Sequence, residues 1–376
     1  LLYYLYFLAH SYISSLKKIK KILIIIQRSN GDVFFSLSLI QALYENYESP
    51  QIDLLVNEDT LPIAHLLSPI NYIHTFSYIK KKKSRWTQEK QIIGSIFRKY
   101  DLSINLTASD RSVLYAIFAA KKSISAIEKD YKKSWWKKIL LTNYYYFNSD
   151  VHILSNNLES LNILKIEYNS ILANPSIQDK VLESIKNRLI NIGVNNFVIF
   201  HPSAQYSYKI YPQQFRDELL SYLSTLGVSV LITGGKTKID TEIKKTIPSL
   251  HNIINLIGET SLEEYFALSS LSIGYIGMDT LNMHIAAAQN KRIFAIFGPT
   301  NLSMWSPWSN QLRKATSHDI PLQNYGNVTI FQANLPCVAC GNAGCDDNHG
   351  KSICLDNISP KAIFDEIKNW YFNNRI

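Results

Sequence analysis

The sequence lacks any apolar run long enough to cross a lipid bilayer. Its longest apolar segment, residues 1–16, falls short of the roughly 20 residues that a transmembrane helix needs. A lysine cluster within residues 17–21 follows this segment, whereas a secretory signal carries its basic residues in front. The aromatic residues and the basic flank predict that segment 1–20 contains an interfacial helix lying on a cytoplasmic membrane surface. A helix packed on the domain and an untrimmed anchor are the alternatives.

The first predicted strand is not followed by a Gly-rich dinucleotide fingerprint. Only Gly31 is present in that loop, which argues against a nicotinamide or flavin site there. Residues 151–376 also lack a charge excess, with 18 Lys and Arg against 18 Asp and Glu. Residues 1–150 hold 21 against 12, so the whole net charge of +9 lies in that half. The asymmetry indicates that this half meets a polyanion, unless it reflects an AT-rich genome that favours lysine.

Cysteine is scarce, and its few positions are clustered. The chain has four cysteines, and their spacing begins with one Cys-x-x-Cys pair but continues without a second. Two interpretations stay open. Either the cysteines hold a structural zinc, with His349 as a substitute ligand, or the segment is a loop with reduced, partly buried thiols. The four positions are Cys337, Cys340, Cys345 and Cys354.

What the sequence does contain is a regular alternation of apolar, β-branched runs with helical patterns. This alternation predicts an α/β fold class, in which parallel sheets are covered by helices on both faces. We predict two Rossmann-like domains, residues 21–175 and 176–358, followed by a C-terminal helix at 359–376. The predicted strands are 22–26, 52–56, 102–106, 124–127, 197–201, 228–233, 253–257, 271–276 and 293–297.

Two segments, 78–90 and 128–138, interleave basic and aromatic residues. Lysines pair with phosphates and aromatic rings stack on sugars or bases, so the segments are suited to grip a polyanion. No recognised nucleic-acid module accompanies them, and we therefore predict no nucleic-acid partner. Solvated loops at the domain edges are the alternative interpretation.

Two strand-to-helix turns lie close together in residues 272–308. Asp279 or Thr280 is placed to cap the helix after the first strand, and the turn from Gly298 to Thr300 follows the second. Two helix N-termini at the carboxyl ends of neighbouring strands form an anion site, because unpaired N–H groups and helix dipoles point into one crevice. The pattern therefore predicts a crevice for a phosphorylated ligand. An ordinary pair of turns in an α/β core is the alternative.

Asp32 stands directly after the first strand, in the turn that leads into a helix. An aspartate in such a turn commonly caps the helix. A general base whose carboxylate faces a crevice between domains is the second interpretation.

These motifs resemble glycosyltransferase family 9, which contains the ADP-heptose:lipopolysaccharide heptosyltransferases. The resemblance covers about residues 20–370, and the motifs occur in the order seen in that family. They are Gly31-Asp32, His201-Pro202-Ser203-Ala204 with Lys209 and Tyr211-Pro212, Thr233-Gly234-Gly235, Asp279-Thr280-x-x-Met283-His284, and Phe297-Gly298-Pro299-Thr300 with Trp305-Ser306-Pro307.

The resemblance implies a GT-B fold, with two Rossmann-like domains facing a central cleft, the acceptor mainly on the first and the nucleotide sugar mainly on the second. It also implies an inverting reaction that needs no metal for catalysis. Asp32 matches the base, and Lys209 matches the cation that stabilises the departing diphosphate. Acceptor contacts fall on Arg28, Ser29 and Asn30. Donor contacts fall on Ser203, Lys209, Gly234, Asp279, Thr280, His284 and Thr300.

The chain departs from the family pattern at two places. Leu281 and Asn282 stand where Gly and Pro usually follow the Asp-Thr pair, and a side chain there narrows the approach to the donor. Asn30 replaces a small or apolar residue before Gly31-Asp32, which alters the predicted acceptor contacts. Leu281 is therefore the position at which we expect the identity of the sugar to be decided.

We predict a cytoplasmic glycosyltransferase, peripheral at the inner membrane, that moves heptose from ADP-heptose to a lipopolysaccharide core or a related anionic glycolipid. One alternative is a family member that uses another nucleotide sugar for an O-antigen or capsule precursor. An alternative from another class is a non-catalytic module that binds a nucleotide or glycolipid.

Overall fold

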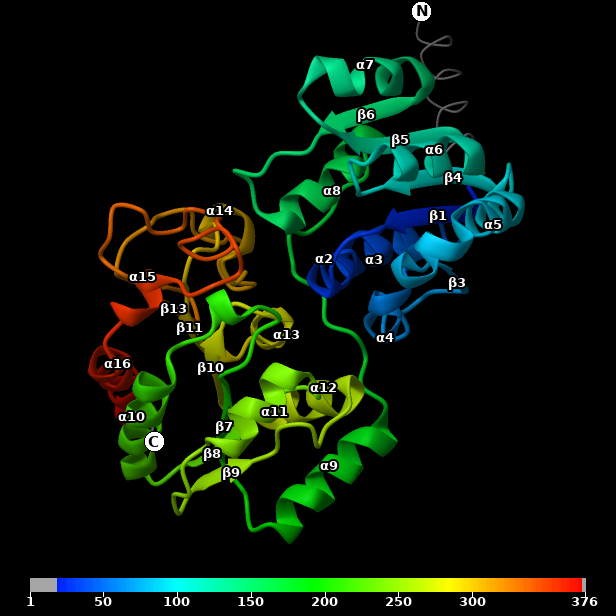
Figure 1. The fold of residues 1–376 in the computed structure, drawn as a ribbon. Helices are drawn as coiled ribbons and strands as arrows, with labels where there is room; N and C mark the ends of the chain where they lie inside the picture. Colours follow the sequence, from blue (N-terminus) through cyan, green and yellow to red (C-terminus); the bar gives the residue numbers. More distant parts are fainter. Residues whose placement is uncertain (1–18, 374–376) are drawn as a thin grey trace, which may run out of the picture. The chain divides into compact units, whose positions relative to one another are not determined.

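The computed structural model describes residues 19–373, and of residues 81–83 it describes the backbone only. The predicted interfacial helix in residues 1–16 lies outside the described residues. The chain divides into two compact units, residues 1–176 and residues 177–376 (Figure 1). Each unit contains one sheet, so each is described by itself.

Unit 1 is built on a six-stranded, entirely parallel sheet in the order β3-β2-β1-β4-β5-β6. Its helices pack in two groups, α5 with α6 and α3 with α8. The strands are β1 Lys21–Ile26, β2 Gln51–Asn57, β3 Tyr72–Phe76, β4 Tyr100–Asn105, β5 Ala120–Ile127 and β6 Asn143–Tyr146. The helices are α2 Asn30–Phe35, α3 Leu37–Asn46, α4 Leu61–Ala64, α5 Tyr78–Ile96, α6 Asp110–Ala119, α7 Tyr131–Leu140 and α8 Ile153–Leu164, with a 3-10 turn, η1, at Glu58–Thr60.

Unit 2 is built on a seven-stranded sheet in the order β12-β13-β11-β10-β7-β8-β9, parallel except for the β12–β13 pair. The strands are β7 Phe197–His201, β8 Ser229–Ile232, β9 Ile253–Asn255, β10 Gly274–Met278, β11 Arg292–Ile296, β12 Leu322–Tyr325 and β13 Val328–Phe331. The helices are α9 Asp179–Asn191, α10 Gln213–Leu223, α11 Lys238–Lys245, α12 Leu262–Leu271, α13 Leu281–Ala288, α14 Leu302–Trp305, α15 Ile353–Asp356 and α16 Pro360–Asn373, with 3-10 turns η2 Ser207–Lys209 and η3 Ser224–Leu226.

The central strands explain why the sequence reads as continuous apolar runs. In β1, Leu23 and Ile25 pack under α5 and α6, while the alternate residues Ile22, Ile24 and Ile26 are buried as well. A strand that is buried on both faces needs apolar residues at every position. The same burial holds along β7 and β10, which are buried at all positions.

In each sheet, the chain first adds strands toward one side of its first strand and later adds the remaining strands on the other side. The point at which it changes sides lies between β1 and β4 in unit 1 and between β7 and β10 in unit 2. Open α/β sheets bind ligands beyond the carboxyl ends of the strands at such a point. The loops after β1, β7 and β10 are therefore where functional side chains are expected.

The predicted strands are all present; β7 has the predicted bounds, whereas the ends of the others differ from the prediction. The strand predicted at 271–276 begins later than expected. Leu271 is the last residue of α12, and β10 begins at Gly274. The prediction missed β3, β6, β12 and β13, which are short; β3, β6 and β12 are edge strands that carry exposed residues. An edge strand is buried on less of its surface, so its apolar signal is weak.

The two basic-aromatic segments are helical, which corrects their alternative interpretation as solvated loops. Residues 78–90 lie in α5 and most of residues 128–138 lie in α7. Across residues 19–373, no helix is both long enough and apolar enough to span a membrane.

Gly277 in β10 is required by the close approach of β7. Its φ of +155° is rare for residues with a side chain, and an added Cβ would lie 2.4 Å from the carbonyl oxygen of His201. We expect Gly277→Ala to lower the free energy of unfolding of unit 2 by about 2 kcal/mol or more. The urea midpoint of that unit measures the loss.

Gly193→Ala is the matched control, because Gly193 also has a positive φ but nothing within 4 Å of an added Cβ. It retains the backbone strain and omits the clash. Equal losses in the two variants would contradict a requirement for close strand packing.

Candidate active site

The candidate donor site lies at the carboxyl ends of β7 and β10 in unit 2. The loop after β7 leads through η2 to Lys209, and the turn after β10 contains Asp279 and Thr280. Because β7 and β10 are parallel neighbours, the two loops leave the sheet at the same edge.

Lys209 and Asp279 form an ion pair across this edge. The Lys209 ammonium lies 3.0 Å from Oδ2 of Asp279, and both side chains are largely buried. Burial opposes the charge of Lys209, but the neighbouring Asp279 carboxylate outweighs it and raises the pKa of the amine above its usual value. Lys209 is therefore held as a cation at the start of α13.

His284 lies one turn into α13 and is buried. Burial lowers the pKa of its imidazole to about 4; the Asp279 carboxylate opposes this shift and the Lys209 ammonium adds to it. At neutral pH His284 is therefore uncharged. Of these two neighbouring side chains, Lys209 is the charged one and His284 the uncharged one.

The first two residues of α13 are the positions at which the chain departs from the family pattern. Thr280 occupies the N-cap position, although its side chain makes no capping hydrogen bond. Asn282 directs its amide to Nδ1 of His201, at 3.1 Å, and so is tied to the end of β7. Leu281 is half-buried. Leu281, the other residue that departs from the family pattern, has an apolar side chain that makes no such hydrogen bond.

Ser203 and Gly234 both lie against Asp240, an aspartate that the sequence motifs did not single out. Ser203 donates from Oγ to Oδ1 of Asp240 at 2.6 Å, and an added Cβ on Gly234 would lie 3.0 Å from the same oxygen. Burial works against the ionised form of Asp240, but hydrogen bonds from Ser203 and Thr237 keep its pKa below the usual value. The pattern Thr237-x-x-Asp240, a capping box, was the available signal.

The second predicted helix terminus is smaller than expected. After Gly298 to Thr300, α14 contains only four residues, and Asn301 caps it by accepting from the backbone N–H of Ser303. A single helical turn has little dipole to offer an anion. Both predicted helix N-termini are therefore present, but α14 is a single turn and α13 is the longer helix that begins at this edge of the sheet.

The Cys-rich segment, residues 337–354, packs on both sides of this site. The carbonyl of His349 accepts a hydrogen bond from Ser207 Oγ at 2.8 Å, next to Lys209. The backbone N–H of Gly341 donates to the carbonyl of Pro299 at 2.7 Å. The His349 ring also stacks on Tyr206, with ring centroids 5.3 Å apart. The segment thus supports the Lys209 loop and the Gly298–Thr300 turn together.

The cysteines themselves do not form a recognisable metal site. Within residues 19–373, no three His, Cys, Asp or Glu side chains are grouped so that they could hold a metal ion. Cys354 is buried, and this burial, together with the nearby Cys345 and Cys340, raises the pKa of its thiol to about 11. Cys345 accepts a hydrogen bond on Sγ from the backbone N–H of Ile353. The structural zinc stays a prediction.

In unit 1, Asp32 is the third residue of α2 and caps its own helix. Its Oδ2 accepts from the hydroxyl of Ser29 at 2.6 Å and from the backbone N–H of Ser29 at 3.1 Å. Its Oδ1 lies 2.8 Å from Nε of Arg28. The capping interpretation of the sequence is therefore correct for this carboxylate, and Arg28 and Ser29 both contact it. Asn30 is exposed beside them.

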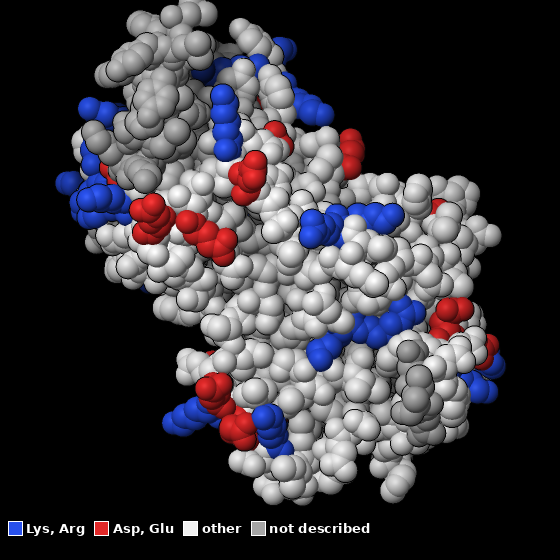
Figure 2. Space-filling view, turned by 180° about the vertical axis from the view of Figure 1, so that it is seen from behind, with Lys and Arg blue, Asp and Glu red and all other residues white. Residues whose placement is uncertain are grey.

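The face of the molecule drawn in Figure 2 does not gather its positive charge into a single patch. On the face shown in Figure 2, Lys and Arg side chains form separate groups that alternate with Asp and Glu side chains. This distribution of charged side chains does not mark one binding site for an acceptor. Acceptor binding therefore depends on individual contacts.

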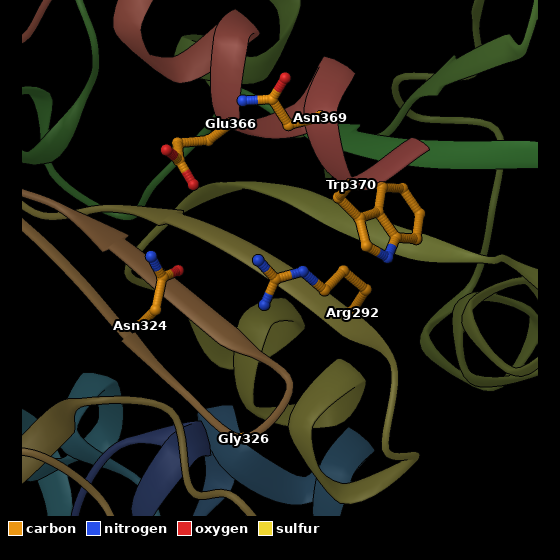
Figure 3. A pocket seen from close by; sticks show the side chains of 6 residues that line it. All are labelled: Arg292, Asn324, Gly326, Glu366, Asn369 and Trp370. Carbon is orange, nitrogen blue, oxygen red and sulfur yellow. The ribbon is translucent and has the colours of Figure 1, made fainter. Parts of the chain in front are cut away.

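A pocket of about 430 Å³ in unit 2 lies away from the candidate site. It is lined by the first residue of β11, Arg292, by Trp370 and two further residues of α16, and by the β12–β13 turn (Figure 3). Because Arg292 marks the amino end of β11, this pocket opens at the sheet edge opposite to Lys209 and Asp279. It is a separate feature from the candidate donor site.

Comparisons with known proteins agree on one family. The sequence model described as glycosyltransferase family 9 (heptosyltransferase) matches residues 91–333. Lipopolysaccharide heptosyltransferase 3 of Escherichia coli is 26% identical over 298 residues, covering 76% of this chain and 85% of that protein. Lipooligosaccharide heptosyltransferase 2 of Haemophilus influenzae is 24% identical over 302 residues, covering 75% and 84%.

Solved structures share the fold. The ADP-heptose lipopolysaccharide heptosyltransferase II of Escherichia coli superposes with a TM-score of 0.70 at 17% identity, covering 95% of this chain and 100% of that one. Escherichia coli heptosyltransferase WaaC with ADP gives a TM-score of 0.68 at 14% identity, covering 93% and 99%. The predicted GT-B type of α/β fold is thereby confirmed.

The buried histidines predict an acid-sensitive unit 2. Burial lowers the pKa values of His201 and His284 to about 4, below the usual 6.5. Above pH 6.5 both are neutral in the folded and unfolded states, and between 6.5 and 4 only the unfolded state takes up the protons. We expect the free energy of unfolding to fall across that window, by up to about 3 kcal/mol per histidine.

Urea unfolding across this pH window measures the effect, with His284→Gln expected to show a shallower fall. His251→Gln, at an exposed position, should keep the slope of the parent chain. If the free energy of unfolding of the parent chain and that of His284→Gln showed the same pH dependence, buried His284 would not be a source of the acid sensitivity.

Proposed function

The chain belongs to glycosyltransferase family 9 (heptosyltransferase), and on that premise we propose that it transfers heptose from ADP-heptose to a lipopolysaccharide core or a related anionic glycolipid. The observation that carries the proposal is the Lys209–Asp279 ion pair at the N-terminus of α13. The similarity to lipopolysaccharide heptosyltransferases supports it. We place the reaction in the cytoplasm, at the surface of the inner membrane.

The donor half of the proposed reaction rests on unit 2. When the bond between the sugar and the diphosphate breaks, the leaving diphosphate gains negative charge. The Lys209 ammonium and the backbone N–H groups that open α13 are positioned to stabilise that charge without rearrangement. Neutral His284 adds a hydrogen bond without a second charge. Since Lys209 supplies the positive charge, the proposed reaction uses no metal ion.

The acceptor half rests on Asp32. The proposed base removes the proton of the acceptor hydroxyl, whose oxygen attacks the anomeric carbon from the side opposite to the diphosphate, so the configuration inverts. Ser29 fixes the orientation of the carboxylate through Oδ2, which leaves Oδ1, on the side of Arg28, for the proton. Arg28, Ser29 and Asn30 are the proposed acceptor contacts.

A different nucleotide sugar is the second candidate, and Leu281 is the observation that favours it. Its half-buried side chain stands at the first position of α13, where the family usually has glycine. Titration calorimetry with ADP-heptose against UDP- and GDP-sugars separates the two candidates. If a UDP- or GDP-sugar bound more tightly than ADP-heptose, that nucleotide sugar would replace ADP-heptose as the proposed donor.

Asp32→Asn tests the base. We expect turnover to fall by about 10²-fold or more, because general base catalysis typically contributes that much. The rate of sugar transfer at saturating donor measures it. Glu264→Gln is the matched control, since Glu264 is also a capping-box carboxylate, at the start of α12. Transfer by Asp32→Asn within a few-fold of the parent rate would remove Asp32 from this role.

Lys209→Met tests the diphosphate cation. The change keeps the length of the side chain and removes its charge, so we expect ADP to bind roughly 10- to 100-fold more weakly. Calorimetry with ADP measures the affinity directly. Lys244→Met is the control, because Lys244 also lies 3.0 Å from a carboxylate, that of Glu259. Unchanged ADP affinity in Lys209→Met would show that the diphosphate is bound elsewhere.

A further inference from the structure

Helix α7 exposes an apolar stripe on the surface of unit 1. Tyr131, Trp135 and Ile139 are spaced four residues apart and therefore lie along one face of the helix. They are 70%, 49% and 71% exposed. The opposite face already holds α7 to the sheet, since Trp136 and the adjacent Leu141 join a small buried cluster. The exposed stripe is thus not needed to attach the helix.

Lysines flank the stripe. Lys132 and Lys133 are exposed, and Lys138 borders the stripe on its other side, with Nζ 5.4 Å from the Tyr131 ring centroid. Lys137 does not add to this charge, because its fully buried ammonium contacts Asp110 and Glu128 at 2.7 and 2.6 Å. The charge beside the stripe therefore comes from Lys132, Lys138 and Lys133, the last of which is exposed although its ammonium lies 4.0 Å from the Asp130 carboxylate.

Strand β6 continues the stripe. It is an edge strand, and its alternate residues Tyr144 and Tyr146 are exposed on one face, with ring centroids 5.8 Å apart. Lys138 lies over both rings, at 5.9 and 5.2 Å, and so joins β6 to α7, its neighbour in Figure 1. We define the α7–β6 patch as Tyr131, Trp135, Ile139, Tyr144 and Tyr146 with Lys132, Lys133 and Lys138.

We propose that the α7–β6 patch docks unit 1 on a membrane surface that contains anionic phospholipid. Aromatic and aliphatic side chains bordered by lysines match the interfacial region of a bilayer, where rings lie at the level of the headgroups and ammonium groups pair with phosphates. The charge of the patch selects this occupant over a neutral apolar surface.

The patch also leads directly to the proposed base. Tyr146 is followed by Phe147, and the guanidinium of Arg28 lies over the Phe147 ring at 4.7 Å. Arg28 in turn pairs with Asp32. A glycolipid anchored in the docked membrane would therefore present its sugar near the carboxyl edge of the unit 1 sheet. This step rests on the proposed function, whereas the docking itself does not.

Vesicle sedimentation of the full chain tests the docking. The parent chain is expected to bind vesicles of phosphatidylethanolamine and phosphatidylglycerol, and to bind phosphatidylcholine vesicles weakly. The double variant Lys132→Glu/Lys133→Glu should lower partitioning to the anionic vesicles by about thirtyfold or more, since each lysine at an anionic surface contributes about fivefold. Trp135→Ser/Ile139→Ser should also lower it, by about tenfold.

Two controls match these changes on exposed helices of unit 2. Ile190→Ser removes an isoleucine that is 67% exposed, and Lys238→Glu reverses a lysine whose side chain is 91% exposed. Both should sediment with vesicles as the parent chain does. Circular dichroism of all variants is expected to be unchanged, because every altered side chain is exposed.

Three results would overturn the proposal. If the patch variants sedimented like the parent chain, docking would be assigned to residues 1–18 or to another face. Binding that is equal on neutral vesicles would remove the role of charge. A parent dimer that the Trp135→Ser/Ile139→Ser variant converts to a monomer would make a second copy of the chain the occupant.

An activity measurement separates this proposal from the proposed function. Patch variants should transfer sugar to a water-soluble acceptor fragment at the parent rate and to a vesicle-embedded acceptor more slowly. If no variant and no parent chain transferred sugar to either acceptor, the proposed function would fail, while the sedimentation result would still decide the docking.

Discussion

The parallel pairing of β7 with β10 determines which side chains meet in unit 2. The pairing is close enough that only glycine fits at position 277, opposite the carbonyl of His201. It brings the loop that ends at Lys209 to the turn that contains Asp279, although 70 residues separate them in sequence. The ion pair between them, the neutral His284 and the N-terminus of α13 all depend on this one strand contact.

The Cys-rich segment acquires a different meaning in the structure. Its spacing suggested metal ligands, yet it contacts the loops around Lys209 and Pro299 through backbone groups and the His349 ring. His349 and Gly341 connect it to two turns of the proposed donor site that are not adjacent in sequence. A segment that holds both turns restricts their movement relative to each other, which favours a preorganised site for a diphosphate.

Asp32 shows how one side chain meets a structural and a proposed chemical requirement. Ser29, at the start of α2, donates two hydrogen bonds to Oδ2 of Asp32, and these bonds fix the direction of Oδ1. The second oxygen faces Arg28, whose guanidinium also covers Phe147 at the end of β6. The proposed base is thereby joined through two contacts to the α7–β6 patch, so that the membrane-docking and acceptor proposals concern one edge of unit 1.

The sequence by itself determined the α/β class, the buried strands and the positions of Asp32, Lys209 and Asp279 after them, because buried parallel strands require continuous apolar runs and leave polar residues in the loops that follow. It did not determine the edge strands β3, β6 and β12, whose exposed residues weaken the apolar signal, nor Asp240, whose link to Ser203 joins residues 37 positions apart. The size of α14 and the exposure of one face of α7 were likewise decided only by tertiary structure. Local pattern specifies which residues can be buried or capped, whereas the partner that each one meets depends on chain segments distant in sequence.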